Sequence, residues 1–300
     1  MTTEGRGILT GLASAPAAPV AIVVFAIVVL WYLAAVWLNA PFQREMYERA
    51  KRGWTTSELI ADTLGQKRPV LPAPHQVAAE IYKTTVLKSV TSKRSLVYHA
   101  WITLSTTLLG FAMGTVLGIG LAVAIVHNQS LDKSLMPWII SSQMIPILAV
   151  APMIIVVLNA IGIQGLLPKA FVSTYLSFFP VVVAMVKGLR APDILHLDLM
   201  HTYSASGWEV FWKLRWPSSV PYLFAAMKVA VAISLVGAIV GELPTGAVAG
   251  LGARLLAGSY YGQTIQIWSA LVVAALLAGT LVALVGWANR FVLARMGMAE

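Results

Sequence analysis

Few residues of this chain have the types and spacing that catalysis needs. The closest histidine pair, His196 and His201, is five residues apart, which places the two rings on different faces of a helix and disfavours a metal site. The sequence holds no HExxH pair, no GxSxG elbow and no cysteine. It also lacks the GxxxxGK[ST] phosphate loop, so we expect no ATP site within it.

The composition predicts a membrane protein. Of the 300 residues, 58% are hydrophobic and 11% are charged, against roughly 25% charged in a soluble domain. So much apolar side chain requires a bilayer as solvent. The net charge of +9 is therefore expected from lysine and arginine beside cytoplasmic ends of spans, and we expect no nucleic-acid partner.

Apolar stretches of spanning length predict about six transmembrane helices. They cover residues 18–38, 101–126, 135–158, 168–186, 222–240 and 265–287. The first one is long enough to cross a layer of ~30 Å at ~1.5 Å per residue, and too long for the apolar part of a cleaved signal peptide. We therefore expect an all-α integral membrane protein whose first span is retained.

The segment 41–98 is the most charged part of the chain, with ten of its 21 basic residues. Helical spacing is plausible over 42–66 and again over 76–87, separated by LPAP at 71–74. Its basic face is expected to meet water or lipid headgroups, and its side of the membrane stays open.

Small and polar residues inside the spans suggest close packing and a transit path. Gly110, Gly114 and Gly118 form a small-xxx-small ladder on one helix face. Three prolines interrupt the third stretch, which is either a path-lining helix or a bent packing helix. The candidates for a path are Ser141, Ser142, Gln143, Pro146, Ser173, Ser177 and Glu242, the last near the outer mouth. Serines in spans are also common helix-packing groups.

A polar interruption of about thirty residues, 191–221, separates the fourth and fifth spans, whereas a simple connection needs roughly six. Pro192 and Asp193 predict a helix start, since proline suits a first turn and a carboxylate meets the positive end of the helix dipole. We expect a bend at 204–207 and a second short helix over 208–216, which Pro217 stops. The result is a compact projection; the alternative is an amphipathic hairpin lying on lipid.

Basic residues orient the chain. Placing 191–221 inside puts eight lysines and arginines of the short segments in the cytoplasm and two outside, once 41–98 is left out. Both termini are then cytoplasmic.

The 191–221 interruption resembles the EAA loop of binding-protein-dependent ABC importer permeases. That pattern is EAA, three residues, Gly, and a proline thirteen residues later. Here Asp198, Leu199 and Met200 hold the triplet, Ser204 the glycine position and Pro217 the proline. Ala205 and Trp208 fit the nitrate, sulfonate, taurine and pyrimidine branch, and Gly207 is a possible source of flexibility in the bend. Further similarity is found at 145–156 and 227–243.

The resemblance implies a type I ABC importer permease fold and a division of labour. It implies an N-terminal span and basic linker (1–98), a permease domain (99–290) and a cytoplasmic tail (291–300). The coupling residues implied are Asp198, Leu199, Met200, Ser204, Ala205, Ser206, Gly207, Trp208 and Pro217. The partners implied are ABC ATPase subunits that bind ATP and Mg²⁺, a second permease copy, a solute-binding protein and the bilayer. The chain itself is then neither an enzyme nor a holder of a cofactor.

The stretch 241–270 is most similar to permeases for pyrimidines, thiamine precursors or riboflavin. The alternatives are a sulfonate, taurine or nitrate permease and an ATP-independent carrier. A carrier is expected to show inverted repeats or a buried ionisable pair, and an intramembrane enzyme needs catalytic residues at bilayer depth. The sequence shows neither feature.

Overall fold

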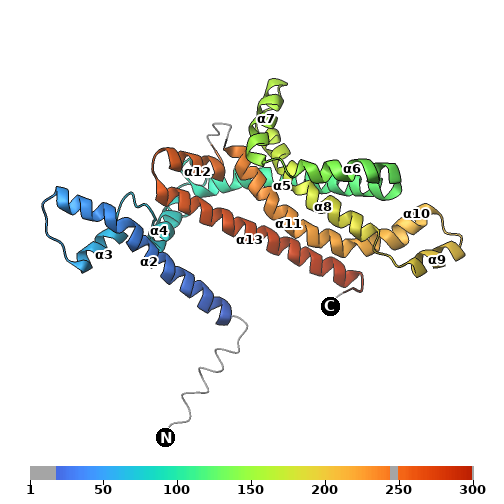
Figure 1. Ribbon diagram of the computed structural model, residues 1–300, viewed down its shortest axis with the longest axis horizontal. Helices are drawn as coiled ribbons and strands as arrows, with labels where there is room; N and C mark the ends of the chain where they lie inside the picture. Colours follow the sequence, from blue (N-terminus) through green and yellow to red (C-terminus); the bar gives the residue numbers. More distant parts are fainter. Residues whose placement is uncertain (1–17, 244–248, 299–300) are drawn as a thin grey trace, which may run out of the picture. The chain divides into compact units, whose positions relative to one another are not determined.

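The computed structural model describes residues 18–243 and 249–298, and within these ranges it contains helices and no strand (Figure 1). The chain divides into two compact units. The N-terminal unit holds the residues up to 87 together with 257–269, and the larger unit holds 88–256 and the residues from 270. Each is described by itself.

The N-terminal unit is built on one long helix, α2 (Ala18–Arg49). Two short helices follow, α3 (Thr56–Leu64) and α4 (Pro74–Thr85). The helix expected over 42–66 is therefore two helices with a break between them. The break ends where Thr55 and Glu58 form a reciprocal capping box that starts α3.

The LPAP segment lies along α2. Asn39, which is 1% exposed, donates from Nδ2 to the carbonyl of Leu71 at 2.8 Å and accepts from the N–H of Val70 at 2.7 Å. Trp31 Nε1 donates to the carbonyl of Pro72 at 3.0 Å. These side chains replace the partners that the proline-rich backbone cannot find in regular structure.

Five helices of the described residues are long and apolar enough to cross a membrane: α2, α5 (Leu96–His127), α8 (Leu166–Leu189), the helical stretch Gly207–Glu242 and α13 (Thr264–Arg295). The third predicted span is different. It consists of α6 (Gln129–Ser142) and α7 (Ile147–Ala160), which meet at 102°.

The third span is not the single kinked or bent helix that was expected, but two helices separated by a break. Proline at position 146 lacks the N–H that would continue α6 and instead occupies the N-cap of α7. Gln143 ends α6, and the two helices run in different directions in Figure 1. The count of spans is six when this bent pair is taken as one span.

Helices α5, α8 and α11 (Trp216–Glu242) form the centre of the larger unit. The glycine ladder of α5 packs directly on α8: a Cβ at Gly118 would lie 2.7 Å from Cβ of Val181, and one at Gly114 would meet Ser177. Gly237 of α11 also packs on α8, where a Cβ would lie 2.7 Å from Cα of Ser173. The ladder thus allows the close approach of backbones that its spacing predicted.

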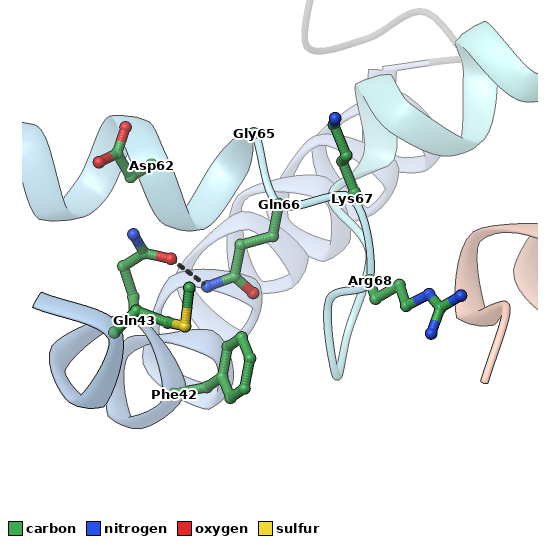
Figure 2. Close-up of a pocket in the computed structure, with 8 residues that line it drawn as sticks. Phe42, Gln43, Asp62, Gly65, Gln66, Lys67 and Arg68 are labelled. Carbon is green, nitrogen blue, oxygen red and sulfur yellow. Dashed lines mark hydrogen bonds between the residues drawn. The ribbon is translucent and has the colours of Figure 1, made fainter. Parts of the chain in front are cut away.

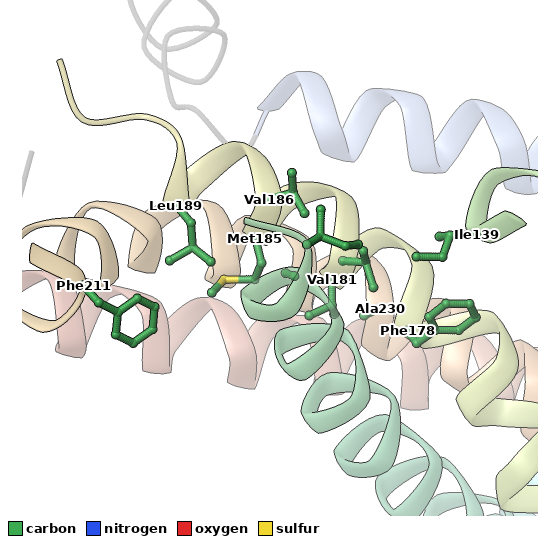
Figure 3. Packing of buried hydrophobic residues seen from close by; sticks show 11 residues of the cluster. Ile139, Phe178, Val181, Met185, Val186, Leu189, Phe211 and Ala230 are labelled. Atoms are coloured by element: carbon green, nitrogen blue, oxygen red, sulfur yellow. The ribbon is translucent and has the colours of Figure 1, made fainter. Parts of the chain in front are cut away.

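An apolar cluster fills the end of this helix group nearest the 191–221 segment. Val181, Met185 and Leu189 of α8 are 0% exposed and lie together with Ala230 of α11 (Figure 3). Phe211, from outside the three helices, is 5% exposed and belongs to the same cluster.

The predicted connection over 242–263 contains a helix, α12 (Leu251–Tyr260). Part of this connection, 244–248, lies outside the described residues.

Candidate functional site

The coupling segment, defined as residues 191–216, forms two helical arms joined by a tight bend. Its first arm is α9 (Ile194–Thr202), capped by Asp193, whose carboxylate accepts from the N–H of Leu195 at 3.4 Å. The sequence predicted this helix start. No residue of α9 is buried, so the arm projects from the rest of the larger unit.

The bend is made at Ser204, whose φ of 53° lies in the left-handed region. The N–H of Ser204 donates to the carbonyl of His201 at 2.9 Å, and the N–H of Ala205 donates to that of Met200 at 3.0 Å. This pair of bonds is a Schellman motif, whose left-handed position is usually glycine. The EAA pattern places its glycine at this same residue, so the geometry explains that position physically.

Gly207 does not make the bend. It is the first residue of α10 (Gly207–Val210), its φ is not positive, and no atom lies within 4 Å of where its Cβ would be. The left-handed conformation of the bend thus belongs to Ser204, and the flexibility of Gly207 stays a prediction. The missing side chain of Gly207 leaves open space beside the bend.

A capping box starts the second arm. Ser206 Oγ accepts from the N–H of Glu209 at 3.3 Å, and the Glu209 carboxylate accepts from the N–H of Ser206 at 3.0 Å. Lys213 donates to the same carboxylate at 2.8 Å. The S-x-x-E spacing at 206–209 is a sequence signal for this cap that our reading of the sequence did not use.

The second arm does not stop at Pro217, contrary to expectation. Residues 211–215 form a π-helical turn, η1 (Phe211–Arg215), which leads without interruption into α11. Pro217 lies in the first turn of α11, where a proline ring is tolerated. Within this turn the N–H of Trp216 donates to the carbonyl of Phe211, which is the i to i+5 bond of a π-helix.

Phe211 fastens the coupling segment to the core. Its ring packs against His127 at the end of α5, with centroids 5.3 Å apart, and against the rings of Trp208, Trp212 and Trp216. Arg215 also donates to the carbonyl of Leu189 at 3.2 Å, which caps the end of α8. The segment is thus in contact with the ends of α5 and α8 and continuous with α11.

An ion pair braces the other end. Arg190, directly after α8, lies 2.8 Å from Asp132 in the first turn of α6. Both side chains are partly exposed, so the pair adds little stability and mainly fixes the direction in which the chain leaves α8.

Eight of the nine residues that the sequence indicated for coupling lie in the coupling segment, and Pro217 follows directly in the first turn of α11. Asp198, Leu199, Ser204, Ser206, Gly207 and Trp208 are exposed, and Met200, Ala205 and Pro217 are half-buried. Trp208 is 70% exposed, although its ring touches Phe211. A large exposed indole is typical of the residues that contribute most to binding another protein.

The polar residues suggested for a transit path lie in two different environments. Ser141, Ser142, Gln143 and Pro146 surround the break between α6 and α7. There Gln143 Nε2 donates to the carbonyl of Tyr175 at 3.4 Å, and the Tyr175 hydroxyl donates to that of Ser142. An apolar cavity of about 370 Å³ lies between α5, α7 and α8, lined by Phe171, Tyr175 and Phe178 among others.

Ser173 and Ser177 lie instead inside the helix group and are 0% exposed. Ser173 Oγ is 2.6 Å from both the carbonyl and the hydroxyl oxygen of Ser234 on α11, and Ser177 Oγ donates to the carbonyl of Gly110 at 3.3 Å. These are the contacts of helix-packing serines. Glu242 is also 0% exposed.

The N-terminal unit has a cavity of its own, of about 560 Å³ (Figure 2). Phe42 and Met46 of α2 form one wall, and Gln66 Nε2 donates across it to Gln43 Oε1 at 2.8 Å. In the described part of the chain, no group of three histidine, aspartate or glutamate side chains is placed to hold a metal ion.

Comparison with known proteins agrees with this geometry. The family model described as "Binding-protein-dependent transport system inner membrane component" matches residues 114–298. Formylaminopyrimidine transport permease protein ThiX of Halalkalibacterium halodurans is 30% identical over 196 residues, 65% of this chain and 73% of the relative. Riboflavin transport system permease protein RibX of Chloroflexus aurantiacus is 30% identical over 221 residues, 74% and 78% of the two chains.

A more distant relative and a solved structure extend the comparison. The putative aliphatic sulfonates transport permease protein SsuC of Bacillus subtilis is 22% identical over 80% of this chain and 87% of its own. The MetNI methionine ABC transporter, solved in inward-facing conformations, matches with a TM-score of 0.55 and 18% identity over 65% of this chain and 93% of that chain, and so supports the fold.

The helix group, its projecting two-armed segment and the permease relatives agree with one another. The chain belongs to the family of binding-protein-dependent transport system inner membrane components, and it is an ABC importer permease rather than an enzyme.

Proposed function

We propose that this chain is the membrane subunit of an ATP-driven importer and that an ATPase subunit grips its coupling segment. The observation that carries the proposal is the segment itself. It exposes Asp198 and Trp208 while Phe211 anchors it in the core shared by α5 and α8. Because the segment is exposed at its tip and anchored at its base, a displacement caused by a bound partner can be transmitted to the membrane helices.

The proposal includes a second permease copy, a solute-binding protein and both termini in the cytoplasm. ATP and Mg²⁺ would be bound by the ATPase, and this chain would hold no cofactor. The charge bias of the short segments supports that orientation. Because the sequence has no cysteine, a single Asp198→Cys variant can be labelled selectively. Reaction with a membrane-impermeant maleimide in intact cells would contradict the cytoplasmic placement.

The ATPase contact is tested by co-purification from membranes. We expect Asp198→Lys combined with Gly207→Trp to lose the ATPase, because the first reverses a charge and the second fills open space on the projection. The matched control is Glu48→Lys with Gly53→Trp, since Glu48 is exposed on α2 and Gly53 also has no atom within 4 Å of its missing Cβ. An intact complex with both coupling-segment changes would refute the assignment.

For the solute we propose a pyrimidine, a thiamine precursor or a riboflavin-like compound. The support is that two relatives at 30% identity are named for formylaminopyrimidine and riboflavin. A sulfonate, taurine or nitrate permease is the second candidate, favoured by relatives at 22% and 23% identity. The test is a binding screen of the cognate solute-binding protein against pyrimidines, riboflavin, sulfonates and nitrate; a sulfonate or nitrate hit would reject the first choice.

A carrier that needs no ATPase is the remaining alternative. Vesicles that contain this chain alone and accumulate solute against a gradient would establish it. We expect such vesicles to show no accumulation until the ATPase and the binding protein are added.

The transit path stays a proposal at the break between α6 and α7. Ser142 and Gln143 are half-buried there and lie beside the aromatic cavity, whereas Ser173 and Ser177 are taken up by helix packing. We therefore expect Gln143→Ala to change the apparent KM for transported solute more than Ser177→Ala does.

A further inference from the structure

A buried carboxylate closes the end of α11 that is farther from the coupling segment. Glu242, the last residue of α11, is 0% exposed. Its carboxylate accepts from Thr103 Oγ1 of α5, at 2.8 Å to Oε1, and from the N–H of Gly252, at 2.7 Å to Oε2. A carboxylate taken out of water is costly unless it is bonded in this way.

Three consecutive backbone donors meet three side chains at this point. The N–H of Gly250 donates to His99 Nδ1 at 2.9 Å, that of Leu251 to Thr103 Oγ1 at 2.8 Å, and that of Gly252 to Glu242. His99 lies at 2.9 Å from the carbonyl of Lys93 through Nε2, which fixes Nε2 as the protonated nitrogen and Nδ1 as the acceptor. We call this set the outer clasp: His99, Thr103, Glu242 and residues 250–252.

The glycines of the clasp are required by space. Gly250 has a φ of 124°, which a side chain would strain, and a Cβ there would meet the Glu242 carboxylate. A Cβ at Gly252 would lie 2.8 Å from Cβ of Glu242. The turn at 250–252 can therefore pack against the Glu242 carboxylate only because positions 250 and 252 have no side chain.

The outer clasp and the coupling segment occupy opposite ends of one continuous helix. The stretch from Gly207 through η1 to Glu242 has 36 residues, or roughly 54 Å at 1.5 Å per residue. A displacement applied near Gly207 is therefore carried along α11 to a residue bonded to α5 and to the turn that begins α12.

We propose that Glu242 is a positioning residue that couples the movement of α11 to the outer ends of α5 and α12. This inference rests on the proposed function, in which an ATPase subunit displaces the coupling segment. The clasp holds the turn at 250–252 on α5, so that the outer end of the helix group moves as one body when the coupling segment moves. Glu242 acts through these bonds and does not touch the solute.

The first test needs neither solute nor ATPase. Leu251 is 0% exposed, and in the cysteine-free chain a Leu251→Cys variant reacts slowly with a hydrophilic maleimide. Adding Glu242→Gln, which keeps the shape and removes the charge, is expected to raise the labelling rate about tenfold, the loss of one charge-assisted hydrogen bond. Adding Thr106→Val instead should leave the rate unchanged, because the Thr106 hydroxyl bonds only within its own helix, to Ile102. Equal labelling rates with Glu242→Gln and Thr106→Val would overturn the clasp.

The second test measures coupling in the reconstituted importer. With Glu242→Gln we expect the ATPase to remain bound and to hydrolyse ATP at the normal rate, while solute moved per ATP falls about tenfold. Thr103→Val should act in the same direction and combine non-additively with Glu242→Gln, since both remove one network. If the Glu242→Gln protein is not stably produced in the membrane, the ratio of solute to ATP measured for Thr103→Val alone tests the positioning role. An unchanged solute-to-ATP ratio would refute the positioning role, whereas loss of ATPase binding in Asp198→Lys concerns only the proposed function.

Discussion

The coupling segment and the α5–α8–α11 group solve opposite problems with the same kinds of residue. In the helix group, glycine and serine allow backbones to touch, and Ser173 and Ser234 bond across helices that have no water to bond to. In the coupling segment, Ser204 and Ser206 shape a bend that stays open to water. The comparison teaches that small residues fix the core by contact and fix the projection by backbone conformation, so substitutions should affect the two regions differently.

A clear loss of stability is expected from adding one methyl group between α8 and α11. Gly237→Ala places a Cβ against the backbone of Ser173, and overpacking of this kind costs about 1–3 kcal/mol. The midpoint of SDS-induced unfolding of the purified protein should fall. Gly120→Ala is the matched control, because no atom lies within 4 Å of its Cβ position, and alanine should stabilise the helix by up to about 1 kcal/mol. Equal midpoints for the two variants would show that the helices are not closely packed.

A smaller loss is expected from removing the serine bond between α8 and α11. Ser234 donates to the carbonyl of Thr107 at 2.8 Å and contacts Ser173. Ser234→Ala should lower the free energy of unfolding by about 0.6–1.7 kcal/mol, the range measured for bonds between membrane helices. Thr280→Ala, whose exposed hydroxyl bonds only within α13, provides the baseline for the same SDS titration. If Ser234→Ala and Thr280→Ala unfold at the same SDS concentration, the hydrogen bonds of Ser234 do not contribute to the stability of the helix group.

In the coupling segment, one substitution should stabilise. Ser204 has a φ of 53°, where glycine is favoured, so Ser204→Gly should relieve up to about 1 kcal/mol of local strain. Hydrogen exchange at the amides of Ser204 and Ala205, the donors of the Schellman bonds, should slow. Faster exchange would mean that the serine side chain supports the bend in a way that glycine cannot.

The smallest effect on stability is expected at an exposed ring of the coupling segment, that of Trp208. Trp208 is 70% exposed, and surface changes of this kind usually alter stability by no more than about 0.5 kcal/mol. Trp208→Ala should therefore unfold at the same SDS concentration as the original protein while weakening ATPase co-purification. Phe211→Ala, next to it but 5% exposed, should lose about 3–5 kcal/mol. If the two variants lose equal stability, the division between surface and anchor is wrong.

Much of the fold could be predicted because membrane-spanning helices consist of long apolar stretches that are recognisable in the sequence. The runs at 101–126 and 168–186 correspond to α5 and α8, and the ladder from Gly110 to Gly118 indicated a close helix contact without naming its partner. The 102° break between α6 and α7 could not be predicted. A proline in a span is compatible with a kinked helix or with two helices, and only the packing partners of Gln143 and Tyr175 decide between them.

The coupling segment was predicted better as a shape than as a mechanism. Asp193 and the small residues at 204–207 indicated a helix and a bend, but which residue adopts the left-handed conformation depends on bonds from Ser204 and Ala205 back to α9. The role of Phe211 was missed because a burial partner such as His127 lies more than eighty residues away in the sequence. The outer clasp was missed for the same reason, since nothing local links Glu242 to Thr103.

The π-helical turn at 211–215 sets the phase of the whole second arm. Each residue of an α-helix advances by about 100°, so one residue more or fewer between Val210 and Trp216 would rotate the projecting tip by about that angle around the axis of α11. Removing one residue there would convert the turn to an ordinary one and aim Trp208 elsewhere, with composition and length almost unchanged. The winding of five residues thus sets the direction in which the exposed face of the coupling segment points.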